Sequence, residues 1–120
     1  MVDYTLNKDA VRHCRELIDA GKYELGGSWS KENPSAKQGD DYIDKHGWHD
    51  YGLWHLGLVD GANDETKKRY GFPYGDFEKV DRAGLAAAAE RAGQNDHAEI
   101  ERAAHELLEH LHDVAGDRED

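Results

Sequence analysis

The sequence has little cysteine and no long apolar run. The single cysteine, Cys14, cannot close a disulfide within the chain, which favours a reducing compartment. The longest apolar run, residues 85–89, is far too short to span a bilayer. Residues 1–10 lack a basic segment followed by an apolar one, so we expect no export signal. Together these absences predict a cytoplasmic protein that does not enter membranes.

Basic residues are scarce relative to acidic ones. The chain has 15 Lys and Arg against 26 Asp and Glu, a formal net charge of -11. The one basic run, residues 67–69, closely follows Asp64 and Glu65. Because a field of this sign repels phosphate backbones, we expect no direct binding to nucleic acid. The acidity is compatible with simple solubility, a high-salt cytoplasm, a basic protein partner or mimicry of nucleic acid.

Length and apolar pattern predict one domain, spanning residues 1–120, with a small core. Only 38% of the residues are hydrophobic, so the core must come from amphipathic stripes. Residues 7–20 place apolar side chains at helical spacing and are followed by a glycine, which predicts a helix. Residues 21–39 are rich in Gly and Ser and lack periodicity, so we expect a long connection with Trp29 as an anchor.

The helical pattern returns at Asp40. A helix from this point would carry aromatic and histidine side chains on two flanks and would be contacted from two directions. Gly47 and Gly52 lie inside the segment and weaken the helical prediction. One flank holds Tyr42, His46, His49 and Leu53, and the other holds Trp48, Tyr51 and His55.

The middle of the chain alternates turn signals with short patterned segments. Residues 60–63 predict a turn, and residues 63–71 predict a short helix with acids first and bases last. Residues 72–80 combine aromatics with Pro and Gly, which predicts a tight loop or a very short hairpin. Asp81 is placed to cap a following alanine-rich helix.

The last helix is predicted to open at Asn95 or Asp96. We expect fraying at residues 1–6 and 114–120. The predicted fold class is mainly α: a small irregular helical domain of four to five helices with an aromatic Pro/Gly loop. The apolar stripe of the last helix comprises Ile100, Ala104, Leu107, Leu108 and Leu111.

The eight histidines suggest a metal site as one hypothesis. His46 and His49 are three residues apart, which on a helix brings both rings to one face. His105, Cys14 or Glu101 could complete a shell around a transition metal such as zinc. This reading makes the chain a metal-binding protein or a metal-dependent enzyme. The alternative is that the histidines are partly buried residues satisfied by backbone or carboxylate partners.

The leading functional prediction is a non-enzymatic interaction or accessory module. Trp and Tyr exceed what so small a core requires, and such residues are favoured as interface anchors. We expect an exposed patch around Trp48, Tyr51 and Tyr74 that binds a protein partner or a second copy of the chain. The alternative is that these rings simply complete the core. No complete catalytic motif is present in the sequence.

Residues 54–91 are more distinctive as a whole than any single site. The run WHLGL, TKKRYGFPYGDFEKV and DRAGLAAAAERA resembles small uncharacterised bacterial and archaeal proteins and, more loosely, short segments of phage-encoded proteins. The resemblance supplies no catalytic residues. It implies one structural unit that contains Trp54, His55, Tyr70, Phe72, Tyr74, Phe77 and Arg82.

Overall fold

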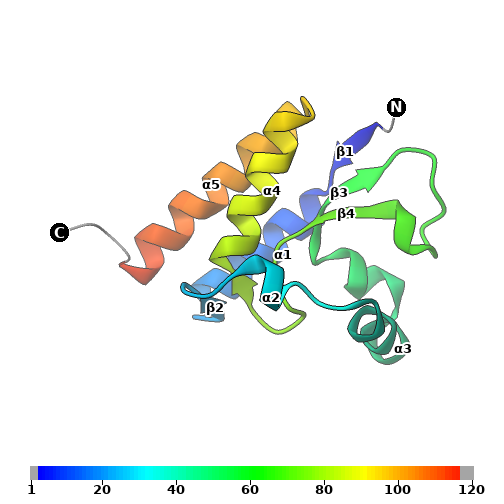
Figure 1. The fold of residues 1–120 in the computed structure, drawn as a ribbon, viewed down its shortest axis with the longest axis horizontal. Coiled ribbons are helices and arrows are strands. Elements are labelled where there is room, and N and C mark those ends of the chain that lie inside the picture. The colour runs from blue at the N-terminus through cyan, green and yellow to red at the C-terminus, as the bar shows by residue number, and fades with distance from the viewer. Residues whose placement is uncertain (1–2, 117–120) are drawn as a thin grey trace.

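A computed structural model describes residues 3–116 of the chain, and the fold is mainly α with a small amount of β (Figure 1). None of the helices in this part is long and apolar enough to cross a membrane. The α-helices of the described residues are α1 (Lys8–Asp19), α2 (Trp29–Glu32), α3 (Ala36–Gly52), α4 (Arg82–Gln94) and α5 (Ala98–Ala115).

A three-stranded antiparallel sheet lies between the helices. Its central strand is β3 (His55–Val59), flanked by β1 (Tyr4–Leu6) and β4 (Tyr70–Pro73). A second pair, β2 (Tyr23–Glu24) and β5 (Val80–Asp81), is parallel and two residues long. The sequence predicted neither pairing, and the residues 4–6 that were expected to fray instead form β1 against β3.

The predicted helix at residues 63–71 is wrong. Only the 3₁₀ turn Lys67–Arg69 is helical, and the following residues pair as a strand with β3. The Asn63 side chain accepts the amide of Glu65 at 2.8 Å and therefore holds a tight turn. Long-range pairing to β3 outweighs local helix signals here, as tertiary context commonly does.

Strand β3 replaces the predicted end of the second helix. Its central glycine, Gly57, lies where three side chains converge: an added Cβ would be 2.8 Å from Phe72, 3.0 Å from Tyr4 and 3.1 Å from Ile100. A larger residue could not occupy this site without moving the aromatic rings. Gly57 thus marks a point where side chains pack directly on the strand backbone. This role was not recognised from the sequence.

Helix α3 starts earlier than predicted and is bent. Ser35 and Gln38 form a reciprocal capping box, so the helix begins inside the expected long connection. Gly47 has φ +87°, which breaks the helix between His46 and Trp48. Trp29 packs on Gly84 of α4, where an added Cβ would be 2.8 Å from the indole.

Helices α4 and α5 form an antiparallel pair that packs against α1 and the sheet (Figure 1). The predicted cap is confirmed: the Asp81 side chain accepts the amides of Ala83 and Gly84. Helix α5 begins after His97, slightly later than predicted, and runs to Ala115 through part of the expected frayed tail. Residues 117–120 of that tail lie outside the described residues.

Candidate functional site

The structure separates the residues predicted to bind metal. Cys14 is fully buried in the core, and burial raises the pKa of its thiol. His46 and His49 are exposed, and the non-helical Gly47 lies between them. His105 and Glu101 are 3.9 Å apart on α5. Within residues 3–116 no three His, Cys, Asp or Glu side chains form a group suited to a metal ion.

The predicted exposed patch is largely inside the molecule. Tyr74 is fully buried, with its hydroxyl donating to the carbonyl of Leu53 at 2.7 Å and its ring stacked on Trp54. Tyr51 is only 8% exposed, whereas Trp48 is partly exposed. The rings of Tyr51 and Tyr74 therefore complete the core, which was the alternative weighed for this patch, and Trp48 alone remains available at the surface.

Trp48 belongs to a three-ring arrangement that includes Tyr70, a residue not singled out as a site from the sequence. The rings of Trp48 and Tyr70 are nearly parallel, with 6.4 Å between centroids and 17° between planes. Tyr51 stands almost perpendicular to both, at 83° to Trp48 and 80° to Tyr70. The Tyr70 ring lies directly over Gly52, where an added Cβ would be 2.6 Å from the ring. The lack of a side chain at Gly52 therefore leaves room for the Tyr70 ring.

A hollow of about 360 Å³, here called the Trp48 pocket, lies beside these rings. Arg69 lines it as the main basic residue, with its Nε 2.8 Å from a carboxylate oxygen of Asp64 and its Nη1 donating to the Val59 carbonyl. The Glu65 carboxylate has no ion pair or hydrogen bond to any residue in the described part of the chain. Other residues that line the pocket include Asp9, Trp48, His49, Asp64, Glu65 and Tyr70.

A second hollow of about 230 Å³, here called the His55 cavity, lies between α3, β3 and the loop after β4. Tyr51, Trp54 and Phe77 supply aromatic walls. His55 is only 6% exposed, and burial lowers its pKa to about 4. Its Nδ1 lies 2.9 Å from the carbonyl oxygen of Tyr51, which can only accept, so Nδ1 carries the proton.

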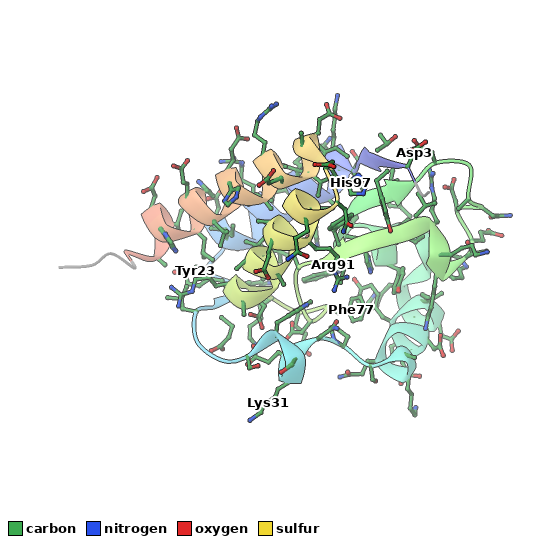
Figure 2. The ribbon with its side chains drawn as sticks, turned by 45° about the horizontal axis from the view of Figure 1, so that its top comes forward. Asp3, Tyr23, Lys31, Phe77, Arg91 and His97 are labelled. Atoms are coloured by element: carbon green, nitrogen blue, oxygen red, sulfur yellow. The ribbon has the colours of Figure 1, made fainter. Side chains whose placement is uncertain are left out.

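Phe77 holds an unusual backbone conformation at the edge of the His55 cavity. Its φ is +70°, a region that side-chain-bearing residues rarely occupy. The Asp76 carboxylate accepts the amides of Glu78 and Lys79, and the Phe77 ring stacks on Tyr42 with 4.5 Å between centroids. Figure 2 shows Phe77 between α2 and β4 in that view. These contacts fix a strained residue as part of the cavity wall.

Comparisons with protein families, with curated proteins and with solved structures found no match to this chain. The two hollows and their side chains are therefore the basis for the functional argument. They differ in chemistry, because acidic residues line the Trp48 pocket whereas the lining of the His55 cavity contains none within the described residues.

Proposed function

We propose that this protein is a non-enzymatic cytoplasmic interaction module that binds a basic segment of a protein partner in the Trp48 pocket. The observation that carries the proposal is the pairing of two near-parallel rings, Trp48 and Tyr70, with the carboxylates of Asp9, Asp64 and Glu65 around one hollow. The lone buried Cys14 supports the reducing location.

The rings suit a cation because an aromatic face carries partial negative charge. A Lys or Arg group within about 6 Å of a ring centroid gains roughly 0.5–1 kcal/mol at exposed sites, and Trp is the best partner. Trp48 is partly exposed and lines the pocket, so a group in the pocket can reach its ring. A flat guanidinium also stacks on aromatic rings, which favours Arg over Lys.

The carboxylates add directionality to this attraction. Asp64 is already paired with Arg69, and Asp9 lies 3.0 Å from Arg12, but Glu65 has no such partner in the described part of the chain. Glu65 is thus the side chain free to receive an incoming cation. The formal net charge of -11 would draw a basic segment toward the protein before contact.

The test uses a short unstructured peptide with one central Arg and the same peptide with citrulline, which keeps the shape of Arg and lacks its charge. Calorimetric titration should show that citrulline weakens binding by about threefold to tenfold, as expected for one exposed cation–π and carboxylate contact. Binding should also weaken as salt is raised. Equal affinity for both peptides would remove the basis of the proposal.

A pair of matched variants locates the contact. Glu65→Gln removes the unpaired carboxylate of the pocket, and Glu106→Gln removes an exposed carboxylate from α5, which Figure 1 shows well apart from α3. Both lower the net negative charge by one unit. We expect only Glu65→Gln to weaken the Arg peptide by more than the general charge effect. If both variants act alike, the attraction is diffuse and the pocket is not the binding site.

A further inference from the structure

The His55 cavity has the walls of a site for a flat molecule. Tyr51, Trp54 and Phe77 line it together with Pro34 and Pro73, so most of its surface is aromatic or apolar. Its volume of about 230 Å³ lies below the ~300–1,000 Å³ typical of pockets that hold drug-sized ligands. The cavity therefore fits one ring or two fused rings.

His55 presents one hydrogen-bond acceptor to this cavity. Because Nδ1 of His55 donates to the Tyr51 carbonyl, the neutral ring presents Nε2 as a hydrogen-bond acceptor. No residue in the described part of the chain donates a hydrogen bond to Nε2. His55 is only 6% exposed, but its Nε2 is not among the buried side-chain atoms that lack a partner, so this atom can be reached from the cavity. An acceptor that opens into a mostly apolar cavity suits a ligand that donates a hydrogen bond.

The remaining polar groups restrict the charge of that ligand. Lys67 lines the cavity, and its Nζ is held by Asp40 at 2.7 Å and by the carbonyl of Ala36 at 3.0 Å. No carboxylate lines the cavity among the residues described. Asp40 already neutralises Lys67, so neither a cation nor an anion would meet an unpaired charge of opposite sign here. These groups therefore favour a neutral ligand.

We propose that the His55 cavity binds a small neutral aromatic ring that carries an N–H or O–H group, such as an indole or a phenol, with that group donating to His55 Nε2. The rings of Tyr51, Trp54 and Phe77 enclose the aromatic body of the ligand. This site is separate from the basic-segment site in the Trp48 pocket, although the Tyr51 ring that lines the His55 cavity also contacts the Trp48 ring.

The probes are indole and phenol, each compared with its methylated form, 1-methylindole or anisole, which keeps the ring and lacks the donor. Titration into ¹⁵N-labelled protein, followed by NMR, reports affinity and the chemical shift of His55 Nε2. We expect the donor-bearing probes to bind about tenfold tighter, since an unmet buried acceptor in the methylated complexes costs that much. The Nε2 signal should move only with indole and phenol.

Asparagine at position 55 is the informative replacement. The amide nitrogen of Asn can take the place of Nδ1 and donate to the Tyr51 carbonyl, but Asn has no atom at the position of Nε2. His55→Asn should therefore erase the preference for indole over 1-methylindole. His55→Gln, which places an amide oxygen near the Nε2 position, should retain part of it, and it serves as the second variant if His55→Asn fails to fold.

Two results would overturn the proposal. One is equal binding of indole and 1-methylindole to the wild-type protein, and the other is the absence of any shift at Tyr51, His55 and Phe77 at millimolar probe. Comparison of indole with N-acetyl-tryptophanamide then assigns the source: tighter binding of the amide indicates an aromatic side chain of a protein, and tighter binding of indole indicates a free small molecule. Glu65→Gln should leave indole affinity unchanged, which separates this result from the peptide test.

Discussion

The α4–α5 pair and the region formed by α3, β3 and β4 use different means to hold together. The helix pair is closed by small and apolar side chains, with Leu85, Ala92 and Leu107 fully buried. The α3–β3–β4 region is closed by aromatic rings and by buried polar groups such as Asn7, whose amide donates to the carbonyls of Gly52 and His55. Apolar packing does not depend on pH, whereas a buried titratable group such as His55 makes stability depend on it.

The largest expected effect lies in the helix pair. Leu107→Ala removes a fully buried side chain from α5 and should lower the free energy of unfolding by about 2–5 kcal/mol, because it leaves a cavity as well as losing apolar burial. Leu108→Ala, at a partly buried neighbour, is the control and should cost less. Urea unfolding at pH 5 and pH 7 checks both, and the loss for Leu107→Ala should be the same at the two values.

The second-largest expected effect on stability lies in the α3–β3–β4 region and depends on pH. His55 has a pKa of about 4 in the folded protein and about 6.5 when unfolded, so the folded state resists protonation. Its contribution to stability is fully present above pH 6.5 and is lost as the pH falls toward 4. The loss is on the order of 3 kcal/mol, since each pKa unit corresponds to ~1.4 kcal/mol.

His55→Asn isolates that contribution, because Asn does not titrate. The wild-type protein should lose more stability than His55→Asn between pH 7 and pH 4.5, as measured by urea unfolding at closely spaced pH values. If the free energy of unfolding of the two proteins changed with pH in the same way, His55 would not have a lowered pKa in the folded protein. The α3–β3–β4 region would then not differ from the helix pair in pH dependence at this residue.

A third experiment tests how closely the rings are fitted to the backbone. Gly52→Ala places a methyl group 2.6 Å from the Tyr70 ring, which must then move. We expect destabilisation of about 1–3 kcal/mol from overpacking and loss of Arg-peptide binding. Gly26→Ala is the control, because the nearest atom to its added Cβ is a carboxylate oxygen 3.8 Å away and its φ is not positive. Thermal unfolding and calorimetry measure the two consequences.

Sequence patterns predicted the helix pair well and the α3–β3–β4 region poorly. Helices α1, α4 and α5 depend on local spacing of apolar residues and on caps such as Asp81, which are visible in sequence. Strands β1, β3 and β4 depend on partners as far away as Tyr4 and Val59. Local signals at residues 63–71 even favoured the wrong element, since nothing nearby encodes the pairing of Tyr70 with Leu58.

The candidate sites show the same division. Trp48 and Tyr51 were recognised as aromatic residues of interest, but their exposure depends on Tyr70 and on the bend at Gly47. The sequence did offer one usable signal: Gly52, four residues after Trp48, leaves room on the same helical face. In the sequence His55 was assigned to the structural unit of residues 54–91, and the role of its Nε2 as an acceptor becomes visible only with the Tyr51 carbonyl in place.

The smallest expected effect on stability is that of replacing Trp48 in the α3–β3–β4 region. Trp48→Ala removes a partly exposed ring that contributes little to the core, so the free energy of unfolding should fall by less than about 1 kcal/mol. Trp54→Ala, by comparison, removes a ring that is 3% exposed and should cost about 3–5 kcal/mol. Urea unfolding distinguishes the two variants.

Trp48→Ala, the variant with the smallest expected loss of stability, should have a large effect on binding. Trp48→Ala should abolish the preference for the Arg peptide over the citrulline peptide, whereas Trp48→Phe, which keeps an aromatic face, should retain part of it. A large stability loss with Trp48→Ala would place this ring in the core with Tyr51 and Tyr74, and the α3–β3–β4 region would then differ from the helix pair in its packing alone. A small stability loss with a lost Arg preference would show that the same region supports the fold through one set of rings and binds through another.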